Sequence, residues 1–262
     1  MTTAQAAVPA FADSAPQLDL KGLLIGGGQG DPTTAAWQNA LDTEGVAYTQ
    51  VNAAGELGSE TVSLRALSSG AHGYHNGVVF ADSPAWFSAG QLTALDSYES
   101  AFGVRQVDGY VYPSASVGLT AGGSGAMSGT AQLTAAGLAG LPELKGPVPF
   151  EVGSYGYPAT PVAGAPVTPW LRDAAGQTLA AVYQHPAADA QAGVSELALT
   201  FDYNATELPW LLLAPRLDQL GYAEHPLGPL PQLLRAGCRR LVHRRQRVEQ
   251  QVPVHPGGDR PR

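Results

Sequence analysis

The 262-residue sequence has one cysteine, almost no lysine and no long hydrophobic run. Cys238 lies near the C-terminal end, so disulfides and cysteine-based catalytic or metal sites are excluded from residues 1–230. No segment reaches the roughly 18 apolar residues that a membrane-spanning helix needs. The sequence therefore predicts no membrane span.

Positive charge is also scarce over most of the chain. Residues 1–230 hold 6 basic and 20 acidic side chains, a balance of −14, whereas residues 231–262 hold 8 basic and 2 acidic, a balance of +6. Nucleic acids are bound by basic surfaces, so they are excluded as partners of the acidic part. A hydrophobic content of 44% is sufficient for a buried core.

The composition divides the chain into three parts. Residues 1–18 are Ala-rich and lack the basic and apolar regions that begin an export signal. We expect a disordered remnant of a cleaved leader and hence an extracellular, secreted protein; an ordinary N-terminal tail is the alternative. Residues 19–225 form the expected folded domain, and residues 226–262 form a basic tail.

Segments typical of buried strands alternate with segments of helical spacing in the first half of the domain. The expected strands are Gly22–Ile25, Gly45–Val51, Gly77–Phe80 and Val104–Val107. The expected helices run from the N-cap Asp31 to Glu44, from Glu60 to Ser68 and from Gln91 to Phe102. This alternation predicts an α/β fold with a doubly wound, mostly parallel sheet of the class I amidotransferase or flavodoxin type.

The pattern changes after Tyr112. Residues 118–140 are dominated by Gly, Ala, Ser and Thr and predict a long excursion from the sheet. Short strands follow at Phe150–Val152, Val167–Leu171, Leu179–Tyr183 and Leu197–Phe201, with hairpin connections at 173–176 and 186–189. These features predict an antiparallel β extension, closed by a helix over about 208–220.

The basic tail has no apolar periodicity. With permitted codons, His243–Gln251 shifted by one base becomes a sequence rich in Asp and Asn. We therefore expect a frameshift near residues 227–230, a truncated chain and a disordered tail at 226–262. A genuine basic tail for an acidic partner is the alternative.

Two motifs that suggest cofactors have the wrong spacing or too few ligands. Gly26–Gly30 follows a strand and opens a helix, but Asp31 stands where a dinucleotide-binding loop needs its third glycine, and its carboxylate repels pyrophosphate. His72 and His75 lie three apart in a Gly-rich loop, but no third metal ligand is nearby. The sequence predicts no cofactor and no metal site, and leaves Tyr74 and the histidines as polar surface residues.

Aromatic side chains are frequent on or beside the predicted loops. They are Trp37, Trp86, Tyr110, Tyr112, Tyr155 and Tyr157. Sugar rings stack on such side chains, and a neutral or cationic sugar polymer tolerates an acidic domain.

Asp202 follows a predicted strand, where open α/β sheets present functional groups; a turn-capping role is the alternative. The candidate ligand-binding residues are Tyr74, His75, Trp86, Tyr110, Tyr112 and Asp202, and no catalytic residue is predicted.

Leu197–Leu213, with the core Ala-Leu-Thr-Phe-Asp-Tyr-Asn-Ala-Thr, and Gly176–Tyr183 resemble the first domain of secreted exopolysaccharide deacetylases of the galactosaminogalactan type. The resemblance covers about residues 20–225. It implies a non-catalytic carbohydrate-binding module whose partner is an amino-sugar polymer. In that family a metal-dependent deacetylase domain follows, and none of its catalytic residues has a match here.

Two alternatives remain open at this point. One is a small α/β hydrolase that uses Asp202 or the loop of His72 and His75. The other is an inactive amidotransferase-like module that binds another protein. The sequence specifies neither the sugar, nor the affinity, nor the oligomeric state.

Overall fold

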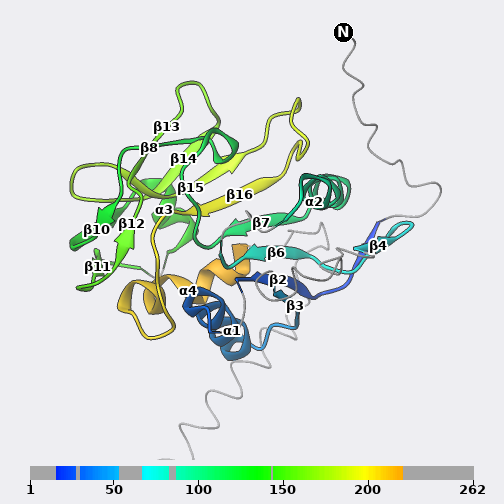
Figure 1. Cartoon of the computed structure of the whole chain (residues 1–262), viewed down its shortest axis with the longest axis horizontal. Coiled ribbons are helices and arrows are strands. Elements are labelled where there is room, and N and C mark those ends of the chain that lie inside the picture. Colours follow the sequence, from blue (N-terminus) through cyan, green and yellow to red (C-terminus); the bar gives the residue numbers. More distant parts are fainter. Residues whose placement is uncertain (1–15, 28–29, 53–66, 83–86, 143, 221–262) are drawn as a thin grey trace, which may run out of the picture. The chain divides into compact units, whose positions relative to one another are not determined.

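The computed structural model describes residues 16–27, 30–52, 67–82, 87–142 and 144–220, with side chains described as far as Ala214. The described part is built on a mixed sheet of 11 strands (Figure 1). The expected leader remnant, most of the helix expected at 60–68, Trp86 and the basic tail lie outside the described residues.

One side of the sheet is parallel, with the strand order β3-β2-β6-β7-β16. These strands are β2 (Gly22–Gly26), β3 (Tyr48–Asn52), β6 (Gly77–Phe80), β7 (Arg105–Asp108) and β16 (Ser195–Leu199). Helix α1 (Pro32–Glu44) joins β2 to β3, and helix α2 (Ala89–Phe102) lies between β6 and β7 in the chain. The alternation predicted from the sequence is confirmed for the described units β2-α1-β3 and β6-α2-β7.

Local side-chain caps explain where the two helices begin. The Asp31 carboxylate accepts a hydrogen bond from the Thr34 N–H at 2.7 Å and caps α1. Ser88 and Gln91 form a reciprocal capping box at the start of α2. Gly45 ends α1 with φ of 70°, in the left-handed region. The carboxylate of Asp31 thus occupies the helix N-terminus that a dinucleotide phosphate would need.

The other side of the sheet is antiparallel. Its strands are β8 (Leu119–Ala121), β10 (Gly129–Leu133), β11 (Val148–Phe150), β13 (Ala159–Pro161), β14 (Val167–Arg172) and β15 (Thr178–Gln184). Strand β16 joins the two sides, because it pairs parallel with β7 and antiparallel with β15. The Gly-rich segment 118–140, predicted as a long excursion, therefore contributes two strands, β8 and β10, to the sheet.

Several smaller elements complete the described fold. They are β1 (Gln17–Leu18), β4 (Ser68–Ser69), β5 (His72–Gly73), β9 (Gly125–Ala126), β12 (Tyr155–Gly156), the 3-10 helix η2 (Ala115–Val117) and helix α3 (Ala135–Gly140). Strands β1, β5 and β4 form a separate three-stranded sheet, and β9 pairs antiparallel with β12. The β9 and β12 pair carries part of the site described below.

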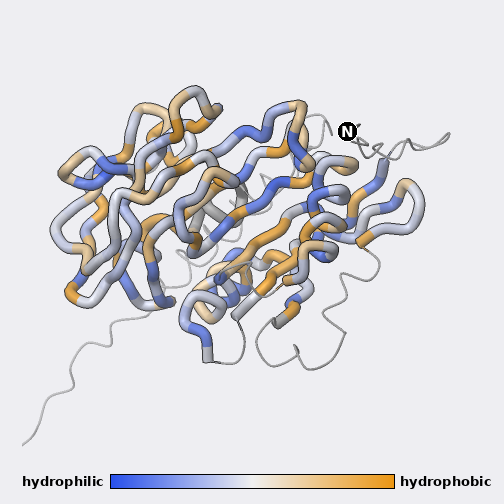
Figure 2. Tube along the Cα trace, turned by 45° about the horizontal axis from the view of Figure 1, so that its top comes forward, coloured by the Kyte–Doolittle hydropathy of each residue, from blue (hydrophilic) through white to orange (hydrophobic). Residues whose placement is uncertain are grey.

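Strands β2 and β6 are buried along their whole length and β7 and β16 from their second residue onward, and Figure 2 shows hydrophobic segments along neighbouring strands. On one face, α1 packs beside α4 (Leu208–Leu220), as Figure 1 also shows. There the buried Trp37 and Trp210 rings meet edge to face at 5.0 Å, so Trp37 belongs to the core rather than to a binding loop. On the other face, Leu95 and Phe102 of α2 pack in a second core cluster with the side chain of Phe80.

The structure confirms a mixed α/β fold with one large sheet. It does not confirm a flavodoxin-like doubly wound fold, because six of the ten strand pairs in this sheet are antiparallel and four are parallel. None of the described helices is long and apolar enough to cross a membrane.

Candidate functional site

Four tyrosines from two distant stretches of the chain form one aromatic cluster, here called the tyrosine platform. Its members are Tyr110, Tyr112, Tyr155 and Tyr157. Tyr157 is central: its ring stacks on Tyr110 with centroids 5.6 Å apart and 19° between the planes. Tyr112 and Tyr155 meet the same ring edge-on at 5.1 and 5.7 Å. The rings are therefore held as one unit, as expected for aromatic pairs at these distances.

The sheet topology brings these side chains together. Tyr110 and Tyr112 follow the carboxyl end of β7, and Asp202 follows β16, the parallel neighbour of β7. The Asp202 Oδ1 accepts a hydrogen bond from the Tyr155 N–H at 2.6 Å, and the Asp202 N–H donates to the Tyr155 carbonyl at 2.9 Å. These contacts span 47 positions of the chain, so Asp202 acts here not as a local turn cap but as a long-range anchor for β12, the strand that begins with Tyr155.

Two members of the platform are open to solvent. Tyr112 is 60% exposed and Tyr155 is 37% exposed, and the neighbouring Val152 is fully exposed. Tyr110 and Tyr157 are half-buried and support them. A group of large exposed side chains that packs on half-buried rings is typical of a ligand-binding surface.

The surroundings of the platform are acidic. Burial raises the pKa of Tyr110, and its hydroxyl contact with Tyr157, 3.3 Å long, raises it further. Burial also raises the pKa of the Glu207 carboxyl, and the negative charges of Asp202 and Glu151 raise it further. The charged groups that act on these side chains are acids, so the site favours a neutral or cationic ligand over an anion.

Tyr74 and His75 lie apart from the platform. They are between β5 and the amino end of β6, whereas Tyr110 follows the carboxyl end of the adjacent strand β7. The imidazole of His75 is buried, which lowers its pKa, and its backbone N–H contacts the Tyr98 hydroxyl at 2.9 Å. Among the described residues, the structure thus places the predicted candidates at two opposite ends of the parallel strands: Tyr74 and His75 lie at the amino ends, and Tyr110, Tyr112 and Asp202 at the carboxyl ends.

The loop histidines show no metal-binding arrangement in the described part of the chain. His72 pairs with Asp19, with 2.8 Å between Nε2 and Oδ1. Among the described residues, no group of three or more His, Cys, Asp or Glu side chains is placed to hold a metal ion.

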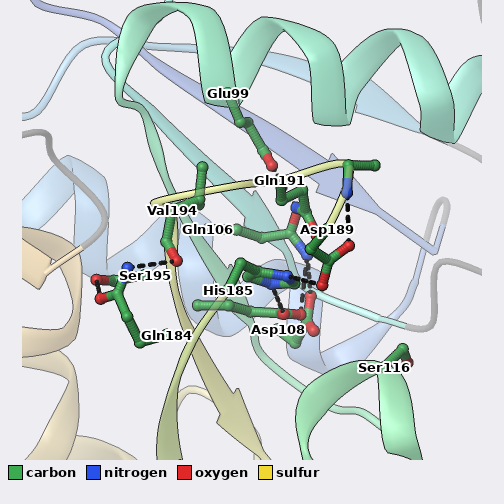
Figure 3. A network of polar contacts seen from close by, with 12 residues as sticks. Glu99, Gln106, Asp108, Ser116, Gln184, His185, Asp189, Gln191, Val194 and Ser195 are labelled. Atoms are coloured by element: carbon green, nitrogen blue, oxygen red, sulfur yellow. Dashed lines mark hydrogen bonds and ion pairs between the residues drawn. The ribbon is translucent and has the colours of Figure 1, made fainter. Parts of the chain in front are cut away.

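A cluster of polar side chains, here called the acid cluster, was not predicted from the sequence. Its members are Glu99, Gln106, Asp108, His185, Asp189, Gln191 and Glu196, and Figure 3 labels all of them except Glu196. The Nδ1 of His185 lies 2.8 Å from Asp189 Oδ2, and its Nε2 lies 2.7 Å from Glu196 Oε2. Neutral imidazole has one N–H, so these two contacts need an additional proton on the ring or on a carboxyl group.

Burial governs the protonation of the acid cluster. It raises the pKa values of Glu99 and Asp108 well above their ordinary values and that of Glu196 to about 7. Glu99, Asp108 and Glu196 are each at most 3% exposed, and only Asp189, with 35% of its side chain exposed, brings the cluster to solvent. We assign it a structural role: it ties α2 and the loop before β16 to the strand that ends next to the platform.

The sequence carried a signal for this cluster. Gln106 and Asp108 lie two residues apart on β7, and Gln106 is opposite Glu196 in the register with β16. In a strand with neighbours on both edges and helices nearby, polar residues at alternate positions indicate a buried polar network.

A glycine between the acid cluster and the platform allows tight packing. A Cβ atom at Gly109 would lie 2.4 Å from the Tyr203 hydroxyl and 2.5 Å from Trp37 Nε1. These two side chains are joined by a hydrogen bond of 2.7 Å from the indole to the hydroxyl, and the Tyr203 ring stacks on Trp210 at 4.2 Å. Glycine thus lets the backbone pass closely over the core as it leads to Tyr110.

No protein-family model and no curated protein sequence matches this chain. Among solved structures, it is similar to Agd3, described as a novel carbohydrate deacetylase, with a TM-score of 0.60 and 20% sequence identity. The match covers 72% of this chain and 30% of that chain, and it shows a shared fold.

Two β-galactosidases are also similar, one from the Antarctic haloarchaeon Halorubrum lacusprofundi and one from Rahnella sp. R3. Their identities are 15% and 11%, and the matches cover 82% and 76% of this chain and 32% and 31% of theirs. TM-scores of 0.46 and 0.49 are too low to indicate a common fold. This chain spans about a third of the length of the three solved structures.

Proposed function

We propose that this chain binds carbohydrate through the tyrosine platform and serves as the non-catalytic binding domain of a polysaccharide deacetylase. The observation that carries the proposal is the cluster of four interlocked tyrosines, two of them exposed, at the carboxyl edge of the parallel strands. Open α/β sheets bind their ligands at this edge. Flat aromatic faces suit the C–H faces of sugar rings.

The fold supports the proposal. The part of Agd3 that resembles this chain is about a third of a carbohydrate deacetylase, and this chain resembles it over most of its own length. The resemblance of Leu197–Leu213 to the first domain of exopolysaccharide deacetylases points to the same assignment. A divalent metal would then belong to the catalytic domain of the parent enzyme.

The proposed ligand is an amino-sugar polymer. The negative charge of Asp202 acts on Tyr110, and the negative charges of Asp202 and Glu151 act on the Glu207 carboxyl. A free amine on a deacetylated sugar carries a positive charge and complements such a surface. An acetylated sugar is neutral and is also compatible with it.

The hydrolase alternative lacks a favourable arrangement. The Oδ1 of Asp202 is occupied by the Tyr155 N–H, and the His72 and His75 loop lies at the other end of the parallel strands. The protein-interaction alternative remains compatible with an exposed aromatic surface, and the binding experiment below separates it from carbohydrate binding.

The test is calorimetric titration of the chain with defined oligomers of β-1,4-linked N-acetylglucosamine and glucosamine, and affinity electrophoresis in soluble chitosan and in partly deacetylated galactosaminogalactan. We expect binding that Tyr157→Ala reduces at least tenfold. Tyr74→Ala, at the opposite end of the parallel strands, is the matched control and should bind like the original chain.

The outcomes separate the alternatives. Binding that is unaffected by Tyr157→Ala would reject the platform, and no retardation by any polysaccharide would favour the protein-interaction module. Metal-dependent release of acetate or of sugars by the isolated chain would favour the hydrolase.

We also propose that the protein acts outside the cell and that residues 226–262 reflect a shifted reading frame. Resequencing the gene across codons 225–262, with mass spectrometry of the C-terminal peptides, tests the second point. Detection of peptides from His243–Gln251 as written would reject it.

A further inference from the structure

We infer that the ligand extends from the tyrosine platform into a second subsite beside β9, so that the domain binds a run of linked sugars rather than a single ring. This inference rests on the proposed function, because it extends the same site. It is carried by a cavity, by the strand register that joins the cavity to the platform, and by the chemistry of the lining.

The cavity, here called the serine trough, has a volume of about 360 Å³. Its lining consists of Gly123–Ser128, Pro158 and Asp173. Ligand-binding pockets of proteins span roughly 300–1,000 Å³, so the trough has the capacity for a small ligand such as one or two sugar units.

The trough and the platform are neighbours across one strand pair. In the pairing of β12 with β9, Tyr155 lies opposite Ala126, and Gly156 lies opposite Gly125. Directly opposed residues of an antiparallel pair are about 5 Å apart, which is comparable with the length of one pyranose unit. Ala126 belongs to the trough lining, so the trough borders the residue that lies opposite Tyr155 in this strand pair.

The residues on the β9 side are small, which leaves room above them. Ser124, Ala126 and Ser128 are all exposed, and the adjacent glycines have no side chain that would fill the space. A sugar ring stacked on Tyr155 or Tyr157 can therefore continue over β9 without meeting a bulky side chain.

The lining offers hydrogen-bonding groups that suit hydroxyl-rich units. The hydroxyls of Ser124 and Ser128 have no hydrogen-bond partner among the described residues, so both are available to a ligand. The Asp173 Oδ1 accepts the Gln177 N–H at 2.7 Å, which fixes the orientation of this carboxylate. Among the described residues, none with a basic side chain lines the trough, and the subsite therefore favours neutral or amine-bearing sugars, like the platform.

The two parts have different roles. The platform contributes aromatic faces and grips the flat side of one or two rings. The trough contributes hydroxyl and carboxylate groups that contact the following unit. A ligand long enough to reach both gains contacts that a monosaccharide cannot make, so the affinity should rise with chain length until the trough is filled.

The experiment measures the affinity for β-1,4-linked N-acetylglucosamine and glucosamine oligomers of one to six units by titration calorimetry. Three proteins are compared: the original chain, the double variant Ser124→Gln/Ser128→Gln, which fills the trough, and Thr130→Gln. Thr130 is an exposed residue of β10 outside the trough lining and serves as the matched control. Thermal unfolding of each variant verifies that the fold is intact.

We expect at least tenfold tighter binding of the hexamer than of the disaccharide by the original chain. The double variant should lose this difference while keeping its affinity for the disaccharide, and Thr130→Gln should behave as the original chain does. An affinity that is independent of chain length, or a hexamer affinity unchanged in the double variant, overturns the trough and leaves the platform in place. If the original chain binds none of these oligomers, both the proposed function and the trough are rejected.

Discussion

Tyr155 and Asp202 are joined by a reciprocal pair of hydrogen bonds, 2.6 Å from the tyrosine N–H to the carboxylate and 2.9 Å from the aspartate N–H to the tyrosine carbonyl. The two residues are 47 positions apart in the chain. This pair attaches the strand that carries half of the tyrosine platform to the segment that follows β16. It makes Asp202 a positioning residue for the proposed binding surface.

We predict that Asp202→Ala weakens oligosaccharide binding about fivefold to twentyfold, because the Tyr155 N–H loses its acceptor and the strand is held less firmly. A hydrogen bond to a charged group contributes about 1.5–3 kcal/mol to stability, and only part of that loss enters the free energy of binding. Asp202→Asn keeps an acceptor oxygen and should recover most of the affinity. Calorimetry of both variants with the hexamer is the measurement. Equal losses in the two variants would instead indicate that the carboxylate charge contacts the ligand directly.

The stacked ring pair in the platform gives a second prediction. Tyr110→Phe removes the hydroxyl contact with Tyr157 but keeps the ring, so we expect less than a threefold loss of binding. Tyr110→Ala removes the support under Tyr157, and since such ring pairs contribute about 0.5–1.5 kcal/mol, we expect a loss of about threefold to tenfold. Fluorescence or calorimetric titration of both variants provides the check, and a loss in Tyr110→Phe as large as in Tyr110→Ala would contradict ring stacking as the cause.

The acid cluster predicts stability that decreases as the pH rises. Glu196 has a pKa of 4.5 as its ordinary value and about 7 in the folded chain, and burial raises the pKa of Glu99 and of Asp108 in the same direction. The folded state therefore binds protons more tightly than the unfolded state. This difference in proton binding stabilises the folded state. The stabilisation is fully present below about pH 4.5 and is lost progressively as the pH rises through 7.

Thermal unfolding followed between pH 5 and pH 8 tests this prediction, with an expected decrease in the free energy of unfolding on the order of a few kcal/mol. Glu99→Gln removes one titrating group and keeps an acceptor for Gln191, so the pH dependence should become shallower. Glu44→Gln, at the exposed end of α1, is the matched control and should leave the slope unchanged. A melting temperature that rises steadily over this range would show that these groups are not protonated in the fold.

Gly109→Ala should destabilise the domain by about 2–4 kcal/mol, because the added methyl group meets the hydrogen-bonded Trp37 and Tyr203 side chains, and overpacking costs at least 1–3 kcal/mol. Gly90→Ala, in the first turn of α2, meets nothing within 4 Å and should be neutral or slightly stabilising. Denaturant unfolding of the two variants gives the comparison. Similar stabilities for both would mean that the backbone at 109 moves away without cost.

Local signals explain what the sequence could predict. The position of β6 is as predicted, at Gly77–Phe80, and α1 begins after the expected N-cap Asp31 and ends at Glu44. A cap, a proline and an apolar run act over a few residues, so their effect is visible in the sequence alone. The same holds for the hairpin connection after β14, where residues 173–176 form the turn.

Long-range relationships were not accessible in this way. In the sequence, Tyr74 and Tyr110 are equivalent as loop tyrosines. Only the strand order and direction place them at opposite ends of the parallel strands. Residues 118–140 contain few β-branched or large apolar side chains, and pairing with other strands, rather than local preference, makes β8 and β10 part of the sheet. Asp108 resembles a solvent-facing strand residue until its partners from β16 and α2 are known.

Strand β16 has a further consequence for the way this domain is made. Ribosomes deliver β7 well before β16, and the intervening 86 residues, from Gly109 to Val194, must be synthesised before the edge of β7 can be covered. An uncovered strand edge is a template for pairing with other chains. Newly made copies therefore pass through a period in which self-association competes with folding, and this period closes when residues 195–199 leave the ribosome and join the two sides of the sheet.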